Sequence, residues 1–195
     1  MGFCILAYVA LVHASVVLAR PGLGGVALVV LLASVLVAPL RARRPWAGPA
    51  LLAGVALAAL AVRYDLTFPL LALPPVALPL AMLLWWGRSL RPGQEPFITR
   101  IATKIRGPLS PEYAAYTRRV TQLWVGVFAL LAVSAAALAA LAPPAVWSLF
   151  TNFLNTAFIG LVFAGEYAWR RWRFRHLPHP GFIAFIRQVA RAGVR

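Results

Sequence analysis

The segment Gly87–Arg119, which reads GRSLRPGQEPFITRIATKIRGPLSPEYAAYTRR, is strongly basic and lies between two long blocks that are almost wholly apolar. Its stretch Phe97–Arg106 divides into two faces when it is placed on a helix that turns about 100° per residue. The apolar face holds Phe97, Ile98, Ile101, Ala102 and Ile105, and the polar face holds Thr99, Arg100, Thr103, Lys104 and Arg106. This pattern predicts a basic amphipathic helix that lies at a membrane surface.

The composition of the whole chain indicates a membrane protein. Of its 195 residues, 62% are hydrophobic and only 12% are charged, so there are too few polar side chains to cover a soluble globule. The net charge is +15, but the basic residues punctuate apolar spans instead of covering a polar domain. We therefore expect anionic lipid headgroups as partners, and no nucleic acid.

Apolar segments of membrane-spanning length set the expected fold. A hydrocarbon core of about 30 Å needs about 20 helical residues. Six segments come near this length: Phe3–Ala19, Leu23–Leu40, Gly48–Val62, Leu66–Trp86, Val120–Leu141 and Val146–Trp169. We expect an all-α membrane protein with about six transmembrane helices and two cytoplasmic interfacial helices, of which the second begins at Phe182.

Four regions follow from this assignment. Residues 1–86 form an N-terminal four-helix membrane region, and residues 87–119 form the basic loop with its interfacial helix. Residues 120–169 form a two-helix membrane hairpin, and residues 170–195 form a basic tail with the second amphipathic helix.

The basic residues predict the orientation. Seventeen of the 19 lie in the connections and tail on one side of the predicted spans, whereas only Arg20 and Arg63 lie on the other. The positive-inside rule places the basic side in the cytoplasm, with both termini, in a bacterial inner membrane. Tryptophans near span ends are expected to anchor the protein at the interface; they are Trp46, Trp85, Trp86, Trp124 and Trp169.

The fourth predicted span is rich in proline, with Pro69, Pro74, Pro75 and Pro79. Each proline removes a backbone donor and crowds the preceding turn, so we expect a broken or kinked helix packed inside the bundle. A hinge or substrate groove is one interpretation, and a static kink is the other.

After the basic loop, Ser110, Pro111 and Glu112 predict the start of a new helix, with Ser110 as its N-cap. A helix from Pro111 to Leu141 would be about 46 Å long, which exceeds the bilayer thickness, so its first turns should project into the cytoplasm. Together with the amphipathic helix, these turns predict a surface for docking or headgroup binding. Its candidate residues are Arg100, Lys104, Arg106, Glu112, Tyr113, Tyr116, Arg118 and Arg119.

Polar residues on the last predicted span form a second candidate site. Asn152, Asn155 and Glu166 share one face of a regular helix, and Arg170 follows Glu166 by four residues, which favours an ion pair. Such a stripe could bind a polar headgroup or position a carboxylate base. Alternatively, the asparagines bridge helices while Glu166 neutralises Arg170.

No catalytic or metal-binding motif is present. His13 stands alone in the first span, and His176 and His179 have no third ligand near them in the sequence. Nucleophile elbows, phosphate-binding loops and dinucleotide fingerprints do not occur. We therefore expect no metal and no cofactor, and favour a non-catalytic protein.

Several motifs in the second half resemble those of a family of small bacterial integral-membrane proteins. The motifs are PFITRIA from Pro96, GPLSPEYAAYTRRVTQLW from Gly107, NFLNTAFIGLVFAGEYAWRRWRF from Asn152 and LPHPGFIAFIR from Leu177. Members of that family are associated with loci for aryl-polyene or xanthomonadin-type pigments and are sometimes labelled ketosynthase. This chain lacks a Cys/His/His condensing site, and the motifs carry no assigned chemistry.

The resemblance implies an inner-membrane accessory or scaffold protein for aryl-polyene-type pigment or acyl-lipid synthesis. Its partners would be an acyl carrier protein or soluble biosynthetic enzymes, because carrier proteins are commonly acidic and a basic surface favours the encounter. The alternative is a membrane-embedded lipid or polyene transferase or transporter that uses the polar face of the last helix.

Overall fold

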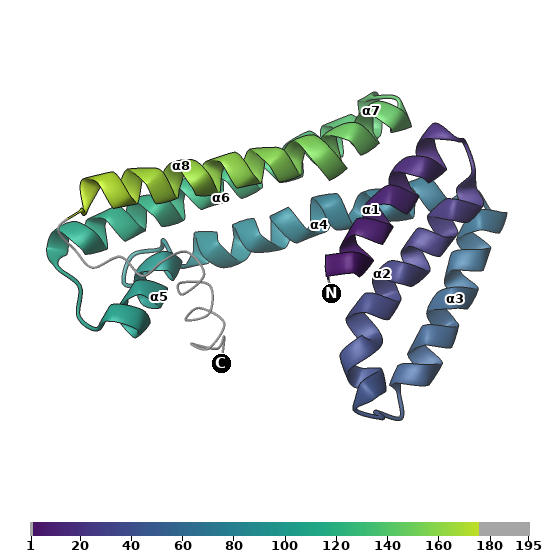
Figure 1. Cartoon of the computed structure of the whole chain (residues 1–195), viewed down its shortest axis with the longest axis horizontal. Coiled ribbons are helices and arrows are strands. Elements are labelled where there is room, and N and C mark those ends of the chain that lie inside the picture. Colours follow the sequence, from purple (N-terminus) through teal and green to yellow (C-terminus); the bar gives the residue numbers. More distant parts are fainter. Residues whose placement is uncertain (1, 176–195) are drawn as a thin grey trace. The chain divides into compact units, whose positions relative to one another are not determined.

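The computed structural model describes residues 2–175, in which all regular structure is helical (Figure 1). The helices are α1 (Gly2–Val17), α2 (Pro21–Arg41), α3 (Ala47–Arg63), α4 (Thr67–Arg88), α5 (Phe97–Arg106), α6 (Pro111–Leu141), α7 (Pro144–Leu149), the π-helical turn η1 (Phe150–Leu154) and α8 (Asn155–Arg173). The second predicted amphipathic helix, from Phe182, lies outside the described residues, as do His176 and His179.

Four helical segments are long and apolar enough to cross a membrane. They are α2, α4, α6 and the stretch Pro144–Arg173, which runs through α7, η1 and α8. Two further apolar helices, Cys4–Val17 and α3, are shorter. The all-helical, membrane-type fold is therefore confirmed, whereas the count of six spans stays a prediction.

The proline-rich helix α4 is continuous from Thr67 to Arg88, so the predicted break is not seen. Pro69 lies in the first turn, where backbone N–H groups have no partner within the helix. At the later prolines, the chain still stays helical. A helix pairs most backbone N–H and C=O groups within itself, whereas an irregular segment in apolar surroundings would leave them without partners.

The first four helices are joined by three tight turns of one type. Helices α1, α2 and α3 each end in a Schellman motif, in which a residue with positive φ lets a later N–H reach back to the last turn. The positive-φ residues are Ala19 (φ 50°), Arg43 (φ 50°) and Asp65 (φ 56°). The backbone bonds run from Arg20 N to Ser15 O (2.9 Å), from Arg44 N to Pro39 O (3.0 Å) and from Leu66 N to Ala61 O (2.8 Å).

The chain packs into two compact units, to which α4, α6 and the last helical stretch all contribute. The first unit holds the described residues up to Ala77 together with Val133–Thr156, and the second holds Leu78–Ala132 together with the described residues from Ala157. The first core is centred on Val12, Ala27, Leu71 and Trp147. The second is centred on Val120, Trp124, Val127 and Leu131.

Trp124 was expected at the membrane interface, and this prediction is wrong. Its side chain is only 4% exposed and packs against Phe128 and Phe163, with ring centroids 5.8 and 4.3 Å away. Because the ring is enclosed by aromatic neighbours of the second unit, Trp124 is a core residue.

Candidate functional site

The basic amphipathic helix α5 is fastened to its neighbours by side-chain hydroxyls. The backbone N–H of Phe97 donates to Ser89 Oγ (3.0 Å), and that of Ile98 donates to Thr121 Oγ1 on α6 (3.2 Å). The first N–H groups of a helix have no partners within it and need such acceptors. The start of α5 is therefore held by the end of α4 and by the side of α6.

Thr99 was expected on the polar face of α5, but it is buried against α6. Its hydroxyl lies 2.8 Å from that of Thr117, which itself donates to Ala114 O (3.0 Å). Thr99 is therefore the donor in the pair. Thr121 continues the chain of bonds by donating to Thr117 O (3.0 Å). These hydroxyls fix the position of α5 along α6, a role that the helical periodicity of α5 alone did not indicate.

The apolar face of α5 also packs on protein. Phe97 lies against Trp85 and Trp86 at the end of α4, with ring centroids 5.0 and 4.4 Å apart. Trp86 in turn packs against the core cluster around Trp124. The helix predicted to lie on the membrane surface is thus an integral part of the second unit.

Glu166 of α8 accepts a hydrogen bond from the hydroxyl of Tyr116 on α6 (2.9 Å) and pairs with Arg170 Nε (3.5 Å). The side chains of Glu166 and Arg170 are 12% and 18% exposed. The predicted pairing of these two residues is confirmed. The tyrosine, 50 residues earlier in the chain, could not be recognised as a partner from helical spacing.

Tyr113 was predicted to be displayed for docking, but it is buried and only 4% exposed. Its ring packs against Phe174, with centroids 4.9 Å apart, and Phe174 also contacts Tyr116 (5.0 Å). The guanidinium of Arg106 lies over the Tyr113 ring, 5.1 Å from its centroid. Phe174, which directly follows α8, therefore packs α6 against the end of α8. Tyr113 is buried beneath the guanidinium of Arg106.

The other predicted docking residues lie at the surface of this unit. Arg100 pairs with Glu95 (Nε to Oε2, 3.9 Å), and Glu112 pairs with Arg173. Arg118 donates to the backbone carbonyl of Leu90 (3.3 Å). Lys104 and Arg119 are exposed, whereas Arg106 and Tyr116 are half-buried. Further exposed cations near these residues in the sequence are Arg88, Arg91, Arg171 and Arg175.

The two predicted polar residues at the start of the last helical stretch belong to the first unit. Asn152 donates to Ser148 Oγ (3.0 Å), and the same oxygen lies 3.1 Å from His13 Nδ1 of α1. His13 is thus part of a hydrogen-bonded group with Ser148 and Asn152. Asn152 lies in η1, where the π-helical turn departs from the regular spacing used to place it, and Asn155 begins α8 and is half-buried.

These contacts limit the chemistry of the described residues. Glu166 is bonded to a tyrosine of α6 and paired with an arginine of α8, so it joins these two helices. Within residues 2–175, no three His, Cys, Asp or Glu side chains are grouped to hold a metal ion. The second unit presents many exposed cations, which suit phosphate or carboxylate groups.

Neither a protein-family model, nor a curated protein, nor a solved structure matches this chain. Its function is therefore inferred from the residues and their geometry.

Proposed function

We propose that this protein is a non-catalytic docking platform in the bacterial inner membrane, with about six transmembrane helices and with both termini in the cytoplasm. Its basic end is built from α5, the first turns of α6 and the end of α8. This end would recruit an acidic soluble partner, and the family resemblance favours an acyl carrier protein that serves aryl-polyene-type pigment or acyl-lipid synthesis.

The charge balance of the second unit is the observation on which this proposal rests. Each of the three acids described in it is already paired with an arginine: Glu95 with Arg100, Glu112 with Arg173 and Glu166 with Arg170. Exposed cations such as Lys104 and Arg119 therefore have no described acid of this unit left to neutralise them. An acidic protein or anionic lipids can supply counter-charges to these cations.

The packing beneath the cations supports docking by a preorganised surface. Hydroxyl bonds fix α5 against α6, and Phe174 and Glu166 join α6 to α8. A partner that binds a rigid charged surface does not have to order it, which lowers the cost of association. The alternative function, a transferase or transporter that uses Glu166 and Asn152, receives less support because both side chains are bonded within the protein.

Binding of purified acyl carrier protein to membrane vesicles containing the native chain tests this proposal. We expect salt-sensitive binding to inside-out vesicles and none to right-side-out vesicles, because only the former expose the basic end. The double variant Lys104→Glu with Arg119→Glu should reduce the binding by at least about ten-fold, since rim charges change association strongly at low salt.

A matched control keeps the net charge change the same. Arg41→Glu with Arg44→Glu alters two exposed arginines at the turn between α2 and α3, on the side predicted to be cytoplasmic. This variant should retain most of the binding. Equal losses in the two double variants would mean that overall charge attracts the carrier protein, and absence of salt-sensitive binding to either face would contradict the docking function.

A further inference from the structure

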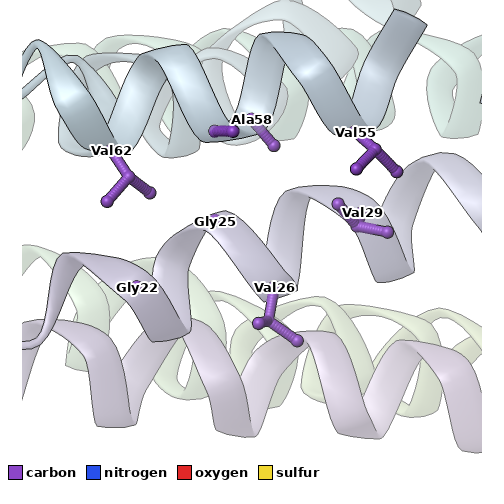
Figure 2. A pocket seen from close by; sticks show the side chains of 8 residues that line it. Gly22, Gly25, Val26, Val29, Val55, Ala58 and Val62 are labelled. Atoms are coloured by element: carbon purple, nitrogen blue, oxygen red, sulfur yellow. The ribbon is translucent and has the colours of Figure 1, made fainter. Parts of the chain in front are cut away.

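A groove between α2 and α3 of the first unit is apolar along its whole length (Figure 2). Residues of both helices line it: Gly22, Gly25, Val26, Val29, Val55, Ala58, Ala59 and Val62. Gly22 leaves open space on the α2 side, whereas Gly25 is buried and lets Val62 approach closely. None of the lining residues has a polar side chain to bind water or a polar ligand. A hydrocarbon chain is the chemical class that fits such a lining.

One end of this groove carries two arginines. Arg20 directly precedes α2, and Arg63 is the last residue of α3. The register places them at the same end, because a Cβ added to Gly25 would lie 2.7 Å from Val62 Cγ2. Both arginines are exposed, and Tyr64 beside them is 66% exposed, as expected for a residue at headgroup level.

Two features leave this end cationic. The spacing of Arg63 and Asp65 predicts a local ion pair, but the ion pairs of the described residues do not include it. Helix α2 also begins without a side-chain cap on its N-terminus. The positive end of a helix adds to the attraction for an anion beside the two guanidinium groups.

We propose that this groove binds an anionic phospholipid, with one acyl chain along Gly22, Val26 and Val29 and the phosphate between Arg20 and Arg63. A second copy of the chain is a poorer occupant. The hairpin of α2 and α3 is basic at both ends, since Arg41, Arg43 and Arg44 lie at the other turn. A copy packed in either direction would therefore place like charges against each other.

Photolabelling tests this site. The probe is phosphatidylglycerol with a diazirine on its acyl chain, in nanodiscs of unlabelled phosphatidylcholine, and the labelled peptides are identified by mass spectrometry. We expect labels within 21–29 and 55–62, and stronger labelling than with the matching phosphatidylcholine probe. The substitutions Arg20→Gln and Arg63→Gln should each lower the ratio of phosphatidylglycerol to phosphatidylcholine labelling about five-fold, because an arginine near an anionic surface contributes about 1 kcal/mol.

Filling the groove should remove the label whatever the headgroup. Gly22→Leu suits this purpose because a Cβ at Gly22 meets no atom within 4 Å, and Gly48→Leu, where the same is true, is the control on α3. We expect loss of labelling for Gly22→Leu and no change for Gly48→Leu. If Gly22→Leu fails to fold, Ala59→Phe, at an exposed position on the opposite wall, fills the groove instead.

Three results would overturn the proposal. Equal labelling by the two probes in the native chain would mean that the arginines select no headgroup. Unchanged labelling after the groove is filled would place the lipid elsewhere. Crosslinks between copies of the native chain that disappear in the Gly22→Leu variant, leaving it monomeric, would identify a second chain as the occupant.

Discussion

The two units of this protein are packed by different means, although helices α4, α6 and the last helical stretch contribute to both. In the first unit, small residues let helices approach closely. A Cβ on Gly24 would crowd Thr67 and Ser15, and one on Gly54 would overlap Leu32. In the second unit, by contrast, a Cβ added to Gly126, Gly160 or Gly165 would meet no atom within 4 Å. Glycines of the first unit therefore let side chains of neighbouring helices pack directly against the helix backbone, and small residues are common at helix contacts in membranes.

In the second unit, aromatic rings and hydroxyl groups make the contacts between helices. Trp124 and Phe174 are buried among other aromatic rings, and Thr121 links α5 to α6. Aromatic packing and directed hydrogen bonds define a single arrangement of helices more sharply than smooth apolar faces do.

The strongest test of this comparison is Gly24→Leu. The added side chain would collide with side chains of α1 and α4, so we expect a loss of about 3 kcal/mol or more in unfolding free energy. Gly160→Leu in the second unit should change stability by less than about 0.5 kcal/mol, because its new side chain meets open space. Unfolding by denaturant in detergent, followed by circular dichroism, measures both. Equal effects would refute the contrast in packing.

The second test compares buried hydroxyls. Thr121→Val keeps the side-chain shape but leaves the backbone N–H of Ile98 without its acceptor, at a cost of about 1–3 kcal/mol. Hydrogen exchange in α5 should become faster. Ser148→Ala in the first unit removes bonds only to the side chains of His13 and Asn152 and should cost about 0.6 kcal/mol, as is usual between membrane helices. A larger loss for Ser148→Ala would show that the polar group of the first unit is the more important one.

The smallest expected effect concerns the turns. Positive φ is adopted by Ala19 in the first unit but by Gly93 and Gly107 in the second. Ala19→Gly removes the strain of an alanine in the left-handed conformation, but glycine also increases the conformational entropy of the unfolded chain. We therefore expect the free energy of unfolding to rise by less than about 1 kcal/mol. Gly107→Ala should instead cost about 1 kcal/mol or more, since φ 78° with ψ −159° is accessible only to glycine. Thermal unfolding of the two variants should therefore shift in opposite directions.

Helix placement was largely predictable because it depends on local patterns. The length of apolar runs indicated the membrane-type helices, and Ser110 was recognised as the cap of α6, where its Oγ accepts from Tyr113 N (3.3 Å). The ion pair of Glu166 with Arg170 followed from their spacing of four residues. Each of these predictions needs only neighbours within a few turns of one helix.

Apart from the expected break in α4, the errors concern which side chains of one helix face another helix. Thr99 and Tyr113 were placed on an exposed surface because each has a polar atom, yet both are buried against other helices. Trp124 was assigned to the interface from its distance to a span end, but it packs in the core of the second unit. A polar group on an amphipathic helix can face water or a matching group on a neighbour, and periodicity is the same in both cases.

The sequence by itself determined a very apolar, helical chain with its positive charge concentrated in a few connections, because composition and local periodicity need no knowledge of distant contacts. Only the tertiary structure decided that Tyr116 meets Glu166 across 50 residues, that α5 is bonded to α6, and that α2 and α3 leave a groove between them. These features depend on the pairing and register of helices, which are set by side chains far apart in the chain.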